Sequence, residues 1–302
     1  MAGSSHPLVQ TDLPASVTLE AGPAGLPRIR TNTPAAEAEV YLHGAHVTSW
    51  TPTGQAPVLW LSSTSAYAPG EAIRGGVPIC FPWFAGHATD AQAPAHGFAR
   101  RLDWTLVDAA HHGNDVQLVF RLADSAQTRS SAWPHRFVAT YRVTVGDALS
   151  LGLEVVNTGD EEVRFEEALH TYYAVGDVRS VSLTGLDGAR YVDRLLPDQR
   201  LRQGPEPVRF ERETDRIYDT QQATVIEDPG HGRAVTTTKA GSTSTVVWNP
   251  WADKASTMAD VGVGEWTGMC CVETGNVRDA SVRLGPAESH TMTATITVRQ
   301  LG

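Results

Sequence analysis

The feature that most constrains the fold is a two-residue hydrophobic alternation that recurs along the chain. Residues 137–145, FVATYRVTV, place an apolar side chain at every second position, and after a Gly-Asp turn the alternation resumes in 148–156. This pair predicts an antiparallel β-hairpin. Residues 115–122 and 290–301 show the same period. Threonine and valine, which are frequent in these segments, favour a half-buried pleated surface.

The pattern as a whole predicts an all-β fold with few short helices. Turn signals separate expected strands at intervals of about ten residues, which is typical of a sandwich. Helical patterns are limited to 64–72 and 253–262. There is no low-complexity linker, so we expect one antiparallel β-sandwich domain over 1–302, in which about the first ten residues are disordered.

Charge and cysteine content exclude several classes of protein. The formal net charge of −10 argues against a general nucleic-acid or anionic-membrane binder. It leaves room for an anionic small molecule, because exposed charges are screened beyond about 8 to 10 Å. The chain has no apolar run long enough for a transmembrane helix and does not begin like a secretory signal. Cys80, Cys270 and Cys271 do not form a disulfide framework, which favours reduced thiols and a cytoplasmic protein.

A long irregular stretch at 62–101 is rich in groups that could bind a ligand. Plain connections are rarely so long, and long loops are usually functional. The stretch holds glycines, aromatic residues, arginines and histidines, namely Gly75, Gly76, Phe81, Trp83, Phe84, Arg74, Arg100, His87 and His96. Aromatic faces beside forked donors suit a sugar ring, so we expect Trp83, Phe84 and His96 to contact one. The glycines would let the backbone approach the ligand closely. The alternative is that the aromatic residues are core and the arginines are surface residues.

A second dense stretch, 246–277, surrounds one carboxylate with aromatic and amide side chains. Glu273 follows an apolar run, and Trp248 and Trp251 precede it. A carboxyl group at the end of an inward-running strand loses hydration, which raises its pKa and makes it a better base near neutral pH. The alternative is a solvated residue at a strand end.

Several motifs occur in the same order as in a known family. They are IRGGVPICFPWF (73–84), HGFARRLDW (96–104), ALHTYYAVGD (168–177), ETDRIY (213–218), VVWNPWADKASTM (246–258) with MCCVE (269–273), and, less specifically, YLHGAHVTSW (41–50). With these motifs the chain resembles the hexose-6-phosphate (glucose-6-phosphate) 1-epimerases of the aldose 1-epimerase, or galactose-mutarotase-like, superfamily.

The resemblance implies a β-supersandwich fold and an isomerase that interconverts the α and β anomers of glucose 6-phosphate and related sugar phosphates. His170 and Glu273 match the family's catalytic histidine and glutamate. Arg74, Arg100 and Asp215 match its substrate-binding residues. The chain departs from the family at Ala95, where some members carry a polar side chain that touches the substrate.

The implied reaction needs only an acid and a base. A base removes the proton of the anomeric hydroxyl while an acid protonates the ring oxygen; the ring opens, the C1–C2 bond rotates, and the ring closes on the other face. We expect His170 as the acid and Glu273 as the base, on opposite sides of the sugar, with Trp83 or Phe84 and Trp248 or Trp251 lining the pocket. No metal or redox cofactor is required, and the expected partner is a small sugar phosphate bound by a monomer or weak homo-oligomer.

Three alternatives remain open from the residues. A mutarotase of free aldoses such as galactose or glucose would share the chemistry but would not need the two arginines. A non-catalytic sugar-binding protein would keep the pocket without proton transfer. A metal-dependent β-barrel enzyme would use four of the eleven histidines, namely His87, His96, His111 and His112.

Overall fold

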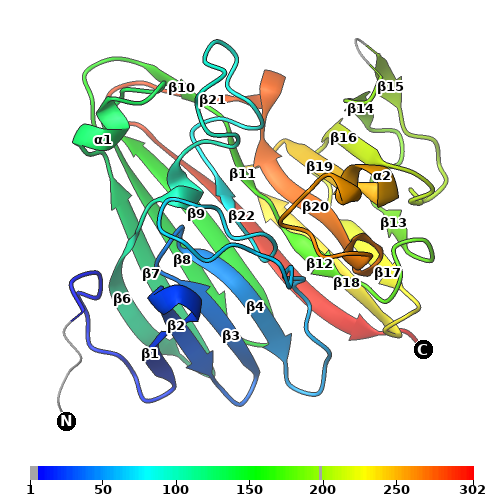
Figure 1. The fold of residues 1–302 in the computed structure, drawn as a ribbon, viewed down its shortest axis with the longest axis horizontal. Coiled ribbons are helices and arrows are strands. Elements are labelled where there is room, and N and C mark those ends of the chain that lie inside the picture. The colour runs from blue at the N-terminus through cyan, green and yellow to red at the C-terminus, as the bar shows by residue number, and fades with distance from the viewer. Residues whose placement is uncertain (1–5, 197–198) are drawn as a thin grey trace.

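The computed structural model describes residues 6–196 and 199–302 (Figure 1). The described strands form two eight-stranded sheets, one four-stranded sheet and one two-stranded sheet. All strand pairs in these sheets are antiparallel. The helices are short: α1 (Ala126–Arg129), α2 (Trp251–Ser256), and the 3-10 segments η1 (Pro23–Gly25), η2 (Ala99–Arg101), η3 (Glu265–Gly268) and η4 (Arg278–Ala280). The prediction of an all-β fold with few short helices is therefore confirmed.

The first eight-stranded sheet contains the segments with the clearest alternation. Its order is β13 (Ser182–Thr184), β17 (Thr224–Asp228), β18 (Arg233–Ala240), β22 (Ser289–Gln300), β9 (Leu149–Asn157), β8 (Phe137–Val145), β7 (Asp115–Ala123) and β6 (Thr105–His112). The predicted hairpin is β8–β9, in register from Phe137 opposite Asn157 to Val145 opposite Leu149. Every second residue of both strands is fully buried, so the alternation arises from a sheet that packs on one face.

The second eight-stranded sheet is built from shorter strands that the alternation did not reveal. Its order is β15 (Arg200–Arg202), β14 (Arg190–Asp193), β16 (Thr214–Asp219), β19 (Ser244–Asn249), β20 (Met269–Asn276), β11 (Glu167–Leu169) and β5 (Ile79–Cys80), and β12 (Tyr172–Ala174) also pairs with β20.

The remaining strands form two small sheets. The four-stranded sheet has the order β1 (Val17–Ala21), β2 (Pro27–Asn32), β3 (Ala36–Tyr41) and β4 (His46–Pro52), and the two-stranded sheet pairs β10 (Val163–Phe165) with β21 (Val282–Leu284).

One large core joins the first eight-stranded sheet to both the four-stranded sheet and the second eight-stranded sheet. In Figure 1 the four-stranded sheet, drawn in blue, lies over β6–β9, and the strands around β20 lie to its right. Two of the hydrogen bonds between the layers involve aromatic side chains. Trp50 of β4 donates from Nε1 to the carbonyl oxygen of Gly146 at 3.3 Å, and the hydroxyl of Tyr173 on β12 lies 2.6 Å from that of Thr237 on β18.

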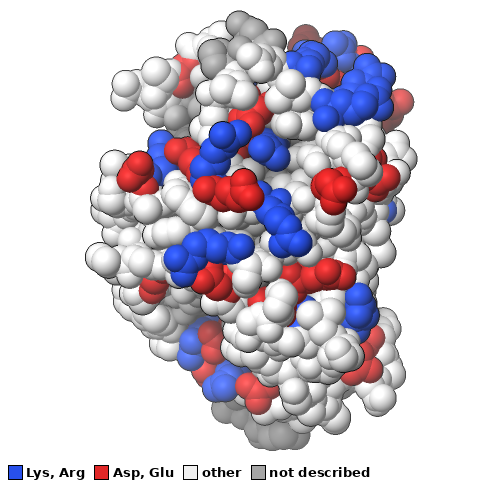
Figure 2. Space-filling view, turned by 90° about the vertical axis from the view of Figure 1, so that its right-hand side faces the viewer, with Lys and Arg blue, Asp and Glu red and all other residues white. Residues whose placement is uncertain are grey.

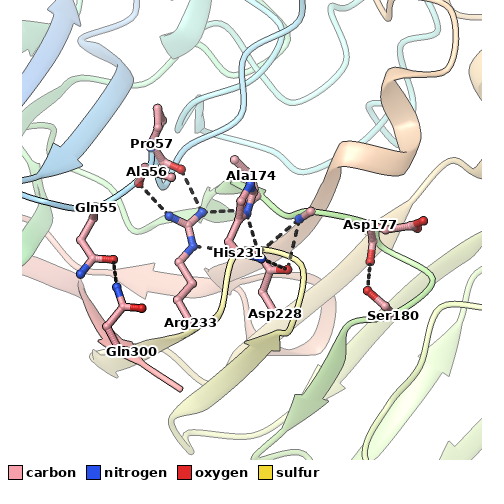
Figure 3. A network of polar contacts seen from close by, with 11 residues as sticks. Gln55, Ala56, Pro57, Ala174, Asp177, Ser180, Asp228, His231, Arg233 and Gln300 are labelled. Carbon is pink, nitrogen blue, oxygen red and sulfur yellow. Dashed lines mark hydrogen bonds and ion pairs between the residues drawn. The ribbon is translucent and has the colours of Figure 1, made fainter. Parts of the chain in front are cut away.

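A buried arginine anchors β12 to the first sheet (Figure 3). Arg233 donates to three backbone carbonyls, those of Ala56, Pro57 and Ala174, at 2.7 to 2.9 Å. The buried Asp228 lies 4.0 Å from its Nε and accepts a hydrogen bond from His231 Nδ1 at 2.7 Å. A buried charge is tolerated only when it is paired and hydrogen-bonded, so this network holds the end of β12 in place.

Some local expectations differ from the structure. Residues 64–72 form turns and irregular structure instead of a helix, and in 253–262 the helix α2 ends at Ser256. The first five residues, for which disorder is expected, lie outside the described residues. Residues 6–10 are described, and Val9 there forms a β-bridge with Leu106. Within the described residues, no helix is both long and apolar enough to cross a membrane.

The net charge of −10 is not spread as a uniform negative field. On the face that lies to the right in Figure 1, basic and acidic side chains stand next to one another (Figure 2). Local positive potential can therefore exist within an acidic protein, as expected from charge screening.

A histidine–glutamate pair links the two eight-stranded sheets. His290 of β22 has its Nε2 3.2 Å from Oε1 of Glu167 on β11, and Glu167 is fully buried. The amide of Asn276 on β20 donates to the same oxygen at 2.9 Å. The hydrogen bond to Glu167 raises the pKa of His290 above its usual value.

This raised pKa predicts how stability depends on pH. A folded-state pKa above the unfolded value of about 6.5 stabilises the fold fully below that pH, and the contribution disappears as the pH rises through the folded pKa. His290→Gln should therefore cost about 1 kcal/mol at pH 5.5 and much less at pH 8.5. Urea unfolding at both pH values measures this. His112→Gln, at the exposed β6–β7 turn, is the control, and an equal loss for His290→Gln at both pH values would contradict the assignment.

Candidate active site

The candidate site lies on the face of the second sheet that is turned away from the main core. Along β20, Cys270 and Val272 point into that core, whereas Cys271 points to the other side. Because side chains alternate along a strand, Glu273 lies on the same side as Cys271. All eight residues of β20 are buried. The alternative that Glu273 is a solvated residue at a strand end is therefore wrong, since its side chain is only 1% exposed.

His170 meets Glu273 directly. It lies between β11 and β12, where its backbone N–H donates to the carbonyl of Pro78 at 3.0 Å. Its Nε2 is 3.4 Å from Glu273 Oε1. A sugar ring does not fit between atoms at this distance, so the expectation that the two groups face each other from opposite sides of the sugar is not met. A side-by-side pair suits the reaction better, because the two reacting oxygens are bonded to the same carbon.

Burial shifts both groups toward their neutral forms. The pKa of His170 lies well below its ordinary value because of burial, and the charges of Arg100 and Arg74 lower it further. The pKa of Glu273 lies well above its ordinary value, mainly because of burial and then because of the charge of Asp215. Two groups in contact titrate as a pair, and both shifts favour the state in which the imidazole is neutral and the carboxyl group carries the proton.

Aromatic rings enclose His170. The ring of Tyr172 stacks on it, with centroids 4.7 Å apart and an interplanar angle of 10°. His96 and Trp248 approach edge-on, with centroid distances of 5.3 and 6.1 Å. The structure thus brings the predicted His96 and Trp248 to the candidate site and adds Tyr172.

Arg74 is held by an acid that the sequence did not single out. Its Nε donates to Oδ2 of Asp260 at 2.9 Å, and its Nη2 lies 2.8 Å from the same oxygen. Its Nη1 donates to the hydroxyl of Tyr172 at 2.8 Å. The phenol oxygen of Tyr172 and the Asp260 carboxylate both raise the pKa of Arg74, while burial lowers it. The guanidinium is therefore fixed beside the His170–Glu273 pair.

Arg100 reaches the site without a carboxylate partner among the described residues. Its Nη2 donates to the carbonyl of Ala95 at 2.8 Å, and its shielded Nε has no partner. Burial lowers its pKa. Two acidic residues near Arg100 in the sequence are engaged elsewhere, since Asp103 pairs with His43 and Asp90 accepts a hydrogen bond from the backbone N–H of Gln92. Arg100 is partly buried, and a cation withdrawn from water usually has a counter-charge, so the site favours an anion.

Asp215 and Phe84 form the side of the site toward β14. Asp215 pairs with Arg194, Oδ2 to Nη1, at 3.0 Å. The guanidinium carbon of Arg194 lies 6.0 Å from the ring centre of Phe84, and that ring lies 4.8 Å from His96. Phe84 is therefore next to the candidate site.

Trp83 does not reach the site. It is 6% exposed, belongs to the main core, packs edge-on against Phe98 and donates from Nε1 to the carbonyl of Pro94 at 2.9 Å. Trp251 packs on Trp266. For Trp83, the alternative of a core aromatic residue is thus correct.

The paired glycines serve the fold instead of a ligand. A Cβ on Gly75 would lie 2.5 Å from the carbonyl oxygen of Trp60, and one on Gly76 would lie 2.2 Å from that of Val47. Both have positive φ, at 113° and 59°. The backbone after Arg74 therefore packs closely against two neighbouring segments, which a side chain would prevent.

The histidines of the metal alternative are not gathered. Within 6–196 and 199–302, no three His, Cys, Asp or Glu side chains are grouped as a metal site. His96 contacts His170, His87 packs on Trp83, and His111 Nε2 lies 3.0 Å from Ser16 Oγ.

Three residues of the site were missed from the sequence. Arg194 and Asp260 lie in loops whose composition is ordinary, and only the fold shows what they contact. Tyr172 had a detectable signal, since it stands two residues after His170 in a strand-like segment, where period two places both on one face.

Comparison with known proteins relates the chain to one family. The family model described as aldose 1-epimerase matches residues 27–297. A protein of Escherichia coli (strain K12) named “Putative glucose-6-phosphate 1-epimerase” is 38% identical over 244 residues, which cover 80% of each chain. A protein of Cenchrus ciliaris with the same name is 36% identical over 264 residues, covering 83% of this chain and 78% of that protein.

Solved structures agree with the fold. A crystal structure from Salmonella typhimurium described as a “putative mutarotase (YeaD)” has a TM-score of 0.89 at 32% identity and covers 96% of this chain and 95% of that one. A galactose mutarotase-like protein from Clostridium acetobutylicum has a TM-score of 0.74 at 14% identity, covering 94% and 98%. The arrangement of sheets is therefore the galactose-mutarotase-like β-supersandwich.

We expect the buried carboxyl group of Glu273 to lower the stability of the folded protein. Because its folded pKa is raised, Glu273 has to take up a proton on folding above the unfolded carboxyl pKa of about 4.3, and the resulting loss of stability grows with pH until the folded pKa is reached. Glu273→Gln should therefore raise stability by about 1–3 kcal/mol at pH 8, with a smaller gain at pH 5. Thermal unfolding at both pH values tests this, and a variant less stable than the wild type at pH 8 would refute it.

Proposed function

The chain belongs to the aldose 1-epimerase family, and from that premise we propose that it interconverts the α and β anomers of glucose 6-phosphate and related hexose phosphates. The observation that carries the proposal is the contact at 3.4 Å between His170 Nε2 and Glu273 Oε1, beside two arginines. One pair of groups can handle the proton while the arginines receive the phosphate.

The proposed reaction conserves protons and bonds. Glu273 takes the proton of the anomeric hydroxyl, and the C1–O1 bond becomes a carbonyl as the bond from C1 to the ring oxygen breaks. His170 protonates that ring oxygen. Rotation about C1–C2 presents the other face of the carbonyl, and the reverse transfers close the ring and restore both groups. General acid–base catalysis of this kind contributes about 10²–10⁴ in rate.

The buried pair supplies the proton that this cycle needs. When the pair holds one proton, the acid step requires it on His170 and the base step requires Glu273 to be free of it. Burial and the charges of Arg100 and Arg74 disfavour the imidazolium form. A bound phosphate dianion would offset those two charges, so the substrate itself favours the form of His170 that donates.

Arg74 and Arg100 are the proposed phosphate ligands. A guanidinium has five N–H donors in a planar fork. Asp260 and Tyr172 together engage three of the five donors of Arg74, which leaves two for another acceptor. Arg100 uses one donor on the carbonyl of Ala95. Charge-assisted bidentate bonds to phosphate are among the strong hydrogen bonds in proteins, which favours hexose phosphates over free aldoses.

Asp215, His96, Phe84 and Trp248 are the proposed contacts to the sugar itself. Asp215 and His96 offer polar atoms to hydroxyl groups, whereas Phe84 and Trp248 offer apolar faces. Asp215 lies opposite Trp248 in the β16–β19 register.

Removal of either member of the acid–base pair should abolish most of the activity. We expect His170→Asn and Glu273→Gln each to lower kcat for anomer exchange by about 100-fold or more. Because the two groups act as a unit, the double variant should lose far less than the product of the single losses. NMR exchange spectroscopy on glucose 6-phosphate measures the rates, and circular dichroism checks folding. Near-normal rates in either single variant would reject the roles.

The phosphate assignment predicts different effects on two substrates. Arg74→Ala and Arg100→Ala should each lower kcat/KM for glucose 6-phosphate by about tenfold to 100-fold, with a much smaller effect on free glucose. Arg101→Ala is the matched control, because Arg101 is in the same 3-10 turn as Arg100 but pairs with Glu71 at 3.6 Å.

Two results would count against phosphate recognition. One is a wild-type enzyme without preference for glucose 6-phosphate over glucose; the other is an equal loss on both sugars in the arginine variants. Either result would replace this proposal by a mutarotase of free aldoses. Absence of any catalysed exchange would leave a non-catalytic sugar-binding protein.

A further inference from the structure

Tyr172 touches both halves of the candidate site. Its ring stacks on the imidazole of His170 at 4.7 Å and 10°, and its hydroxyl oxygen accepts a hydrogen bond from Arg74 Nη1 at 2.8 Å. The side chain is buried, with 1% exposure. Arg74 is therefore bonded to the side chain whose ring stacks on His170, so a displacement of Arg74 would act on that ring.

The surroundings hold Tyr172 firmly. Its backbone N–H donates to the carbonyl of Gly76, and its carbonyl accepts from the N–H of Trp60, both at 2.9 Å. The ring of Trp60 also stacks on it, with centroids 5.6 Å apart. Two residues later, the carbonyl of Ala174 is bound by the buried Arg233. A tyrosine held in this way can pass a displacement of Arg74 on to His170, because its surroundings leave it little freedom to move independently.

The hydrogen bonds between Arg74, Asp260 and Tyr172 leave further donors that could bind an anion. Asp260 Oδ2 engages Nε and Nη2 of Arg74, and Tyr172 engages one hydrogen of Nη1. One hydrogen of each Nη is therefore not used by these two partners. Tyr172 accepts from Arg74, so its own O–H is still available, and its polarity is strengthened by the guanidinium that it binds.

We propose that Tyr172 is a positioning residue that couples anion binding at Arg74 to the proton-handling His170. The inference rests on the proposed function, and it adds that the phosphate organises the reacting end of the site as well as holding the substrate. Binding energy from a remote group can be used in this way to raise kcat. The charges of Arg74 and Arg100 lower the pKa of His170, so an anion that offsets them favours the imidazolium form.

Removal of one hydroxyl tests the coupling, and the next residue provides the control. Tyr172→Phe keeps the stacked ring but loses the contact to Arg74. Tyr173→Phe removes an equally buried hydroxyl from the same strand, one that bonds to Thr237 on the opposite side. We expect Tyr172→Phe to lower kcat/KM for glucose 6-phosphate about tenfold, including a fall in kcat, with little change for glucose. Tyr173→Phe should leave the ratio of the two substrates unchanged.

An anion supplied separately from the sugar gives a second measurement. Sulfate is a weakly basic dianion, so it can occupy an anion site with little catalysis of its own. We expect sulfate at constant ionic strength to accelerate turnover of free glucose by the wild type and by Tyr173→Phe several-fold, and to have little effect on Tyr172→Phe. Enzyme-free and His170→Asn samples with sulfate serve as blanks.

The outcomes separate this proposal from the function on which it rests. Equal losses on glucose and glucose 6-phosphate in Tyr172→Phe, or equal sulfate activation of the two tyrosine variants, would overturn the coupling while leaving the epimerase intact. A wild type without anomer exchange would overturn the function. In that case the NMR resonances of the His170 imidazole would test the coupling between Arg74 and His170. A sulfate-induced shift that is lost only in Tyr172→Phe supports it, and an equal shift in all three proteins overturns it.

Discussion

The burial of β20 is the constraint on which the rest of the site depends. This strand is covered on both faces and pairs with β11, β12 and β19. Its alternation directs Cys270 and Val272 into the core and Glu273 to the other side. A carboxylate in that position is poorly hydrated, and its Oε2 has no partner among the described residues. The stability of the core strand therefore holds a group that would otherwise favour water.

The charges around Glu273 are the reason why we propose an anionic sugar as the substrate. Arg74 and Arg194 have acid partners, whereas within the described part of the chain Arg100 has a backbone carbonyl as its partner and no carboxylate. Its charge disfavours protonated His170 and favours ionised Glu273. A phosphate would offset that charge at short range, where low polarity makes electrostatic interactions strong. The acidic surface farther away is screened and has little influence on this balance.

Distant packing determines the position of the reacting groups. His170 lies at the junction of β11 and β12, and β12 is tied to the first sheet by Arg233 and by Tyr173. On the opposite side, Gly75 and Gly76 allow the segment after Arg74 to pack against Trp60 and Val47. Tyr172 is thus placed between two anchored segments, which explains how a small site can keep an arginine and a histidine in a fixed relation.

The sequence by itself determined the fold class, the β8–β9 hairpin and the family, because period-two burial and ordered motifs are local properties of the chain. Through the motifs it also indicated His170, Glu273, Arg74, Arg100 and Asp215. Only the tertiary structure decided that Trp83 is a core residue, that His170 and Glu273 lie side by side, and that Asp260 and Tyr172 hold Arg74. These facts depend on contacts between residues up to 186 positions apart. A local pattern predicts which face of a strand is buried, but it does not identify the distant side chain that packs on that face.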